Sequence, residues 1–402
     1  MRLLAERPVI KPELGQSEDF SLVLGGPLYQ LLLRSGLIRP PFGNLASRIA
    51  VLTVFAWLPL VALTILGGTF AAGVPVPFLY DFAVQARFLF ALPLLIVAEA
   101  VVYLRMRAIA AQFVERQIIT ESVRPAFRAV ISSAMRLRNS LAAEILLLLF
   151  VFLVGPAVRR ETLALHSDSW YATAAVSSYR YAPAGYWYAF VSVPLFQFIL
   201  VRWYYRIFIW CRFLFQVSRL DLNLVATHPD RCAGLGFLGS VVFAFAPLLM
   251  AHTCLVAGFI ANRILHEGAS LPQYRIELLA VAVVLLALVL GPLCVFIPKL
   301  NSARLAGLRI YGRLASDYVN GFAAKWTREP SAEREPLLGT SDIQSLADLA
   351  NSFAVVKEMK VIPFGKDTVV RFLVVIALPL TPLLFTMFSL EELIKRFFKI
   401  VL

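Results

Sequence analysis

One short segment of the chain combines more groups capable of chemistry than any other. It holds a histidine, a carboxylate, a guanidinium and a Gly-x-Gly-x-x-Gly pattern, in His228, Asp230, Arg231, Gly234, Gly236 and Gly239. The glycines expose backbone N–H groups, and the N-terminus of a following helix carries a partial positive charge. An anion or a lipid headgroup could therefore be held there. The alternative is a tight turn in which Asp230 caps the helix and the glycines allow close helix packing.

The sequence around this segment does not fit the motifs of soluble proteins that it resembles. The His-Pro-Asp tripeptide of a J-domain lies in a soluble two-helix hairpin, and a dinucleotide site requires a βαβ unit. Here the glycines lead straight into an apolar stretch. The sequence also contains no GxxxxGK[ST], HExxH or GxSxG pattern and no CxxC pair. We therefore predict no catalytic residue, metal site or cofactor.

Ionisable residues inside apolar stretches form the second group of candidates. Glu99 is expected about one turn from the end of one membrane span, and Glu144 about one turn into the next, so the two could meet at one level. They could share an ion-coordinating or proton-relay role, or each could pair with a neighbouring arginine. His252 is expected near the centre of a span, as a gate, a proton carrier or a hydrogen-bonded packing residue.

Four arginines in or beside these stretches are expected to extend along apolar surface toward the membrane interface. They are Arg87, Arg202, Arg206 and Arg371. A long aliphatic stem permits this arrangement when the residue lies near the end of a span.

The elements that position these residues follow from composition. Of 402 residues, 59% are hydrophobic and 16% are charged, which is more apolar than a soluble domain allows. The sequence predicts an all-α, polytopic membrane protein with about seven membrane segments, six plus a possible re-entrant one. These segments are expected at Ile49–Ala71, Val84–Leu104, Ser140–Val158, Tyr186–Tyr205, Leu238–Ile260, Ile276–Ile297 and Thr368–Phe388.

The net charge of +13 indicates orientation rather than nucleic-acid binding. With the N-terminus in the cytoplasm, the three outside loops carry only five of the 38 Lys and Arg residues, as the positive-inside rule requires. The basic C-terminal tail disagrees, because seven spans would place it outside. Pro379 and Pro382 permit a re-entrant last segment instead.

Four regions organise the chain: 1–48 at the cytoplasmic interface, 49–298 with six spans and a cytoplasmic helical loop at 105–139, 299–366 in the cytoplasm, and 367–402. The sixth span is expected to continue into the cytoplasm as a long helix. A new helix, with a capping box of Ser341 and Gln344, has an apolar stripe over 341–360 that needs another helix or subunit. A C-terminal amphipathic helix is expected to lie on the membrane.

Two stretches carry a family resemblance. The HPDR-x-x-GLGFLG segment and the run from Ser341 through Val361-Ile362-Pro363-Phe364-Gly365 to Glu392 resemble a group of bacterial multi-pass inner-membrane proteins with no assigned activity. The resemblance covers roughly the second half of the chain. It implies a location in the bacterial cytoplasmic membrane.

These features favour a homo-oligomeric channel or transporter for small ions, with Glu99, Glu144 and His252 on the ion pathway. An excess of arginine at the inner mouths suggests anions. The alternatives are a scaffold or accessory subunit that binds a partner protein through helix 341–360, and a lipid-handling intramembrane enzyme. Membrane lipids are the other expected partners.

The orientation can be tested by cysteine labelling. Ser331→Cys, in the basic region between the last two predicted spans, should resist an impermeant thiol reagent in intact cells, because this region is expected in the cytoplasm. It should react after the membrane is permeabilised. Labelling in intact cells would contradict the predicted orientation.

Overall fold

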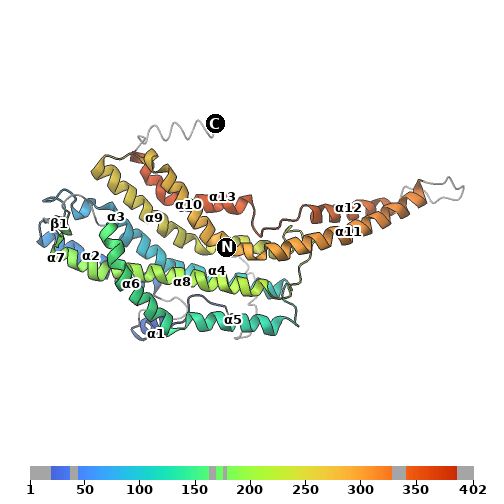
Figure 1. Cartoon of the computed structure of the whole chain (residues 1–402), viewed down its shortest axis with the longest axis horizontal. Helices are drawn as coiled ribbons and strands as arrows, with labels where there is room; N and C mark the ends of the chain where they lie inside the picture. Colours follow the sequence, from blue (N-terminus) through green and yellow to red (C-terminus); the bar gives the residue numbers. More distant parts are fainter. Residues whose placement is uncertain (1–19, 37–43, 163–168, 175–178, 328–340, 387–402) are drawn as a thin grey trace, which may run out of the picture.

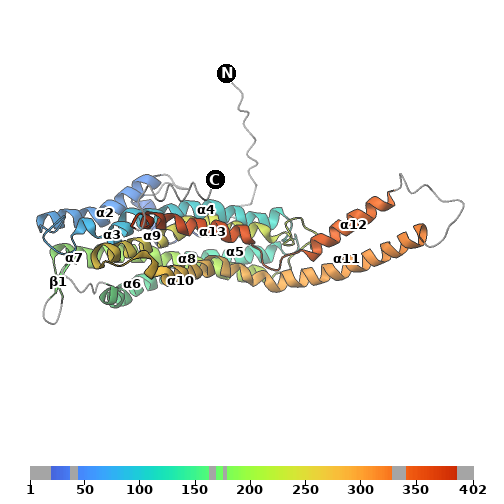
Figure 2. The same ribbon diagram turned by 90° about the horizontal axis from the view of Figure 1, so that it is seen from above.

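The computed structural model describes residues 20–36, 44–162, 169–174, 179–327 and 341–386, shown in Figures 1 and 2. Regular structure in this part is helical except for an antiparallel hairpin of β1 (Ala172–Ala174) and β2 (Tyr179–Tyr181), in which Thr173 pairs with Arg180. The α-helices are α1 (Pro27–Arg34), α2 (Leu45–Leu66), α3 (Phe82–Gln85), α4 (Leu92–Glu115), α5 (Arg124–Arg138), α6 (Leu141–Thr162), α7 (Pro183–Trp187), α8 (Val193–Ser218), α9 (Val241–Glu267), α10 (Arg275–Leu290), α11 (Ile297–Trp326), α12 (Asp342–Lys357) and α13 (Lys366–Ala377).

Short helical segments of other types join several of these helices into longer ones. Two are π-helical, η3 (Ala86–Ala91) and η4 (Tyr188–Ser192), and five are 3₁₀, η2 (Phe78–Tyr80), η5 (Leu235–Ser240), η6 (Leu271–Tyr274), η7 (Gly291–Phe296) and η8 (Leu378–Thr386). Through η7, α10 continues into α11, as the sequence predicted for the sixth span. The predicted C-terminal amphipathic helix lies outside the described residues.

Among the described residues, six helical segments are long and apolar enough to cross a membrane. They are Leu45–Leu66, Phe82–Glu115, Pro183–Ser218, Leu235–Glu267, Leu271–Trp326 and Lys366–Thr386. Each matches one of the seven predicted segments. The remaining prediction, Ser140–Val158, falls on α6, whose apolar part Leu141–Leu153 is shorter.

The order of contacts fixes the direction of the central helices. Arg87 hydrogen-bonds to Tyr188 near the start of the α3–α4 and α7–α8 segments, and Glu99 meets Arg206 further along both. These two segments are therefore parallel. The chain must return between them, and it does so through α5 and α6, which lie along α8 (Figure 1).

Burial separates central from peripheral helices. Half of the residues (50%) in the most apolar stretch of Leu235–Glu267 are buried, against 17% for α2 and 17% for Lys366–Thr386. The π-helical turn of η3 and Gly258 of α9 allow a close approach, since a Cβ on Gly258 would lie 2.5 Å from that of Ala86. The peripheral helices leave large apolar side chains such as Phe55 and Val374 exposed, as expected for surfaces in contact with lipid.

Beyond the central helices, the end marked by α5 is a packed helical body. Phe113 of α4 contacts Phe127 of α5 and Phe237 of η5, with ring centroids 6.0 and 5.1 Å apart. Phe20 packs on Phe213 of α8 at 4.3 Å. Within the predicted helical loop 105–139, α4 runs to Glu115 and α5 covers Arg124–Arg138, with a non-helical turn between them.

α11 and α12 form a hairpin that projects from the body (Figure 2). α12 therefore packs on a helix of its own chain, where Phe353 is half-buried and Val356 fully buried. The predicted capping box is wrong, because the Ser341 side chain makes no capping hydrogen bond. Instead, Asp342 accepts hydrogen bonds from Lys325 and Trp326, 2.9 and 3.0 Å away, which tie the start of α12 to the end of α11.

Candidate functional site

The site is built from five charged residues on four helices, hereafter the ionic cluster: Arg48, Glu99, Glu144, Arg202 and Arg206. Their level along the bundle is set by helix length. Arg48 lies 18 residues before the end of α2, Glu99 lies 17 residues after Phe82, and Arg202 lies 19 residues after Pro183. At 1.5 Å per residue, all three lie roughly 25–29 Å from the same end of the bundle, close to the thickness of the hydrocarbon core.

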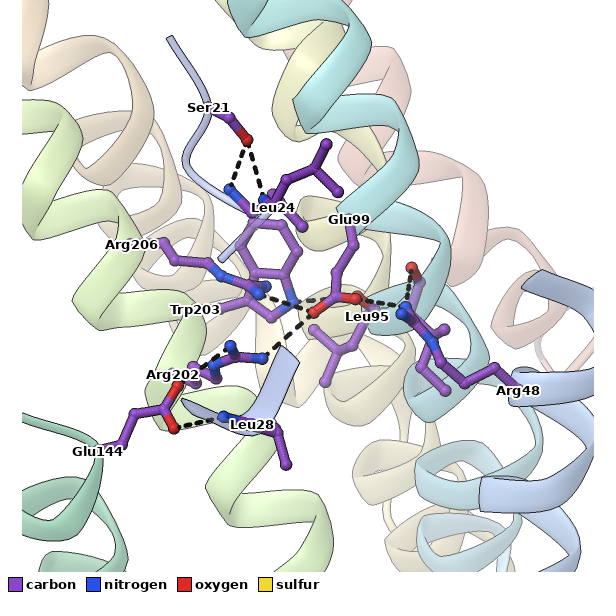
Figure 3. A network of polar contacts seen from close by, with 12 residues as sticks. Ser21, Leu24, Leu28, Arg48, Leu95, Glu99, Glu144, Arg202, Trp203 and Arg206 are labelled. Atoms are coloured by element: carbon purple, nitrogen blue, oxygen red, sulfur yellow. Dashed lines mark hydrogen bonds and ion pairs between the residues drawn. The ribbon is translucent and has the colours of Figure 1, made fainter. Parts of the chain in front are cut away.

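Glu99 is the centre of the ionic cluster. Its carboxylate accepts hydrogen bonds from Arg48 and from Arg206, the latter at 2.8 Å, and Arg202 lies 3.7 Å away (Figure 3). The Arg206 guanidinium also lies over the Trp203 ring, 4.7 Å from its centroid. Three guanidinium groups thus converge on one carboxylate.

Glu144 is joined to Glu99 through a shared arginine. Arg202 lies 3.2 Å from the Glu144 carboxylate, which also accepts a hydrogen bond of 2.8 Å from the backbone N–H of Leu28 (Figure 3). This second bond fixes the start of α1 to α6. The structure therefore places both glutamates at one level, as expected, and pairs both with arginine.

The prediction that Arg202 and Arg206 extend along apolar surface is wrong, because both turn into the bundle and pair with glutamates. Both are buried, with 8% and 4% of their surface exposed, because their charges are satisfied inside the bundle. The ionic cluster holds three cations and two anions, so one positive charge is in excess. Arg138 of α5 lies beside it. Burial lowers the pKa of Arg138 to about 10, which leaves it charged at neutral pH.

A cavity of about 80 Å³ adjoins the ionic cluster. Arg48, Glu99, Arg202 and Arg206 line one part of it, and the other part is apolar, formed by Leu28, Leu52, Ile96, Leu195, Phe198 and Ile199. The lining comes from α1, α2, α4 and α8. The cavity therefore combines guanidinium hydrogen-bond donors, which could bind an anion, with an apolar wall.

His252 does not belong to this cluster. Its ring nitrogens lie 2.7 Å from the Tyr204 hydroxyl and 2.7 Å from the carbonyl oxygen of Leu248. This arrangement matches the interpretation of His252 as a hydrogen-bonded packing residue. Among the described residues, no three His, Cys, Asp or Glu side chains gather as metal ligands, and all four cysteines are free thiols.

The Asp230 loop, residues 227–239, surrounds its own carboxylate. Both oxygens of Asp230 accept backbone hydrogen bonds, from Cys232 at 2.8 Å, Gly234 at 3.1 Å and Gly236 at 2.9 Å. The glycines explain the shape, since Gly234 has a φ of 95° and a Cβ on Gly236 would lie 2.9 Å from Asp230 Oδ2. Burial alone would raise the pKa of Asp230, but these donors and His228 outweigh it and lower the pKa.

The loop also joins distant parts of the chain. Arg231 forms an ion pair of 2.7 Å with Glu358, and its carbonyl oxygen accepts a hydrogen bond from the Lys360 N–H. Gly239 lies against Thr368 at the start of α13. The two stretches that carry the family resemblance are therefore in contact. A bound anion would need the N–H groups of Gly234 and Gly236, but both already donate hydrogen bonds to Asp230.

Sequence reasoning missed Arg48, which lies just before the first predicted span. It is 4% exposed and contacts both Glu99 and the carbonyl oxygen of Ile96. The predicted spans carried no signal for it, because Arg48 lies outside the first one, and only the structural helix bounds place it at the same distance from the end of the bundle as Glu99 and Arg202. Comparison with protein-family models, curated proteins and solved structures finds no match for the chain. The site must therefore be interpreted from its own geometry.

We expect Glu99→Gln to destabilise the protein by about 3–5 kcal/mol, because it keeps the shape but leaves buried guanidinium groups without their carboxylate. Thermal unfolding in detergent measures the effect. The matched control is Glu267→Gln, since Glu267 pairs with Arg263 on an exposed surface and such pairs contribute about 0–1 kcal/mol. Equal effects of the two variants would contradict a central role for Glu99.

Asp230→Asn should cost about 1–3 kcal/mol, because an amide cannot accept at both positions that the carboxylate uses. The folded-state pKa of Asp230 is lowered. Its contribution is therefore present in full well above the ordinary pKa of about 3.9 and is lost as pH falls through the folded-state value. Asp221→Asn, at an exposed carboxylate nearby, is the control. Unfolding curves that show no difference between the two at neutral pH would refute this role.

Proposed function

We propose that this chain is a multi-pass membrane transporter for small anions, with the ionic cluster as its ion-binding site. The observation that carries the proposal is the Glu99 carboxylate, held by Arg48, Arg202 and Arg206 beside a cavity at membrane depth. Ionisable groups within membrane segments mark ion pathways in many proteins. A set of guanidinium donors that holds one carboxylate can hold another anion in its place.

The proposal gives Glu99 a specific task. Its carboxylate is a tethered anion that occupies the position where the donors converge, so a transported anion competes with it. The excess positive charge of the cluster favours an anion over a cation as the partner. Arg138 strengthens that preference because it places a further cation beside Glu144 and Arg202.

The proposed arrangement in the membrane follows from helix direction and charge. Because α4 and α8 are parallel, α6 serves as an additional crossing between them, giving seven in all. The basic regions then place the N-terminus and the α11–α12 hairpin in the bacterial cytoplasm. The apolar outer faces of α2, α10 and α13 contact lipid or further copies of the chain in a homo-oligomer.

A second candidate function is that of an accessory subunit, and the projecting α11–α12 hairpin favours it (Figure 1). Ile310 and Ile343 are exposed on this hairpin. A partner protein at this position would not require the ionic cluster. Anion flux therefore separates the two candidates.

The test is chloride efflux from liposomes that contain the purified protein. We expect flux from the wild type, and we expect Glu99→Gln to lower the half-saturating chloride concentration at least about tenfold, because the tethered competitor loses its charge. Glu267→Gln, at the exposed Arg263 pair, should behave as the wild type. Absence of wild-type flux, or an unchanged half-saturating concentration in Glu99→Gln, would overturn the proposal.

A further inference from the structure

The cavity beside the ionic cluster has two unlike parts, and the apolar part is not what an inorganic ion requires. Six aliphatic or aromatic side chains face the space next to the guanidinium groups. A hydrated ion would lose water against walls that offer no hydrogen bond in return, whereas an apolar chain needs none and can pack against them. The lining therefore matches a ligand that carries both a charge and a chain.

On the polar side, one guanidinium group keeps a buried nitrogen without a hydrogen-bond partner. Arg48 is 4% exposed, it lines the cavity, and its Nε has no hydrogen-bond partner within the described part of the chain. Leaving a buried donor unpaired is costly, so an acceptor oxygen on a ligand would be favoured there. The cluster also carries one positive charge in excess, which a monoanion would neutralise.

The apolar part of the cavity is lined by side chains that reach the protein surface. Five of its six apolar side chains, those of Leu28, Leu52, Leu195, Phe198 and Ile199, keep part of their surface exposed. They lie on α1, α2 and α8. The cluster lies at the depth where the hydrocarbon core ends, so a ligand could enter from the bilayer with its head at the interface and its chain among the lipid tails.

The volume limits how much of the ligand is enclosed. About 80 Å³ is roughly half of the 150 Å³ cavity that accepts benzene in another protein. Only the head and the first few carbons of a chain fit inside. The remainder would follow the half-exposed face of α8 outward.

We propose that this cavity binds an amphiphilic monoanion, an anionic headgroup on an acyl chain, which enters laterally and places its oxygens at Arg48 and Arg206. The inference rests on the proposed function and deepens it, because it names the class of anion that the same site takes. Glu99 shifts away from Arg206 to admit the head. Two sources supply this chemistry, a free fatty acid and an anionic phospholipid.

The experiment measures equilibrium binding of radiolabelled decanoate to the full-length protein in phosphatidylcholine nanodiscs, with empty nanodiscs as the blank. We expect saturable binding, competition by unlabelled decanoate and none by decanol, which has the chain without the charge. Ile199→Phe fills the apolar part without touching the cluster and should weaken binding at least tenfold. Leu200→Phe, the neighbouring residue outside the lining, should bind as the wild type.

The outcomes distinguish a fatty acid from a phospholipid as the ligand. They also separate failure of this inference from failure of the proposed transport function. Displacement of decanoate by phosphatidylglycerol supports the site with a phospholipid as its ligand, and resistance to it supports the free acid. Equal competition by decanol, equal binding to empty nanodiscs, or unaltered binding by Ile199→Phe overturns the inference. Chloride flux without decanoate binding would overturn the amphiphilic ligand but leave the transporter function standing. Decanoate binding without anion flux would overturn the transporter function.

Discussion

The arrangement of the bundle depends on keeping Glu99 paired inside it. A carboxylate placed here is tolerated because guanidinium groups from α2 and α8 reach it, and the carboxylate in turn offsets much of the desolvation of those groups. The pairing therefore fixes the relative height of α2, α4 and α8. Since α1 is fixed to α6 by Glu144, which shares Arg202, the same set of charges also orders the start of the chain.

The level of the ionic cluster divides the molecule into two parts with different interiors. Toward the β-hairpin, the helices are apolar on their outer faces and suited to lipid. Toward α5, aromatic rings such as Phe113, Phe127 and Phe213 pack a helical body that extends α4 and α8 beyond the expected thickness of the membrane. Charges that would be costly at the bilayer centre thus lie where the two parts meet.

The Asp230 loop joins the projecting hairpin to the membrane helices. The carboxylate organises the loop through backbone N–H groups of Cys232, Gly234 and Gly236, while Arg231 and its carbonyl oxygen hold the segment between α12 and α13. The loop thus contacts both the end of α12 and the start of α13. The glycine pattern serves the shape of this junction, which explains why it lacks the strand that a nucleotide site requires.

The sequence by itself determined the all-helical class and the approximate place of the six helical segments that are long and apolar enough to cross a membrane, because long runs of Leu, Val, Ile and Phe favour such helices. It also singled out Glu99, Glu144 and Asp230, since charges beside apolar runs are conspicuous. Tertiary structure alone decided which groups these residues meet. Arg202 and Arg206 have the spacing of interfacial residues, and Arg48 precedes its span, so nothing local shows that all three face Glu99. That outcome depends on α4 and α8 running in parallel at one height, a relation between segments about a hundred residues apart that hydrophobic periodicity does not encode.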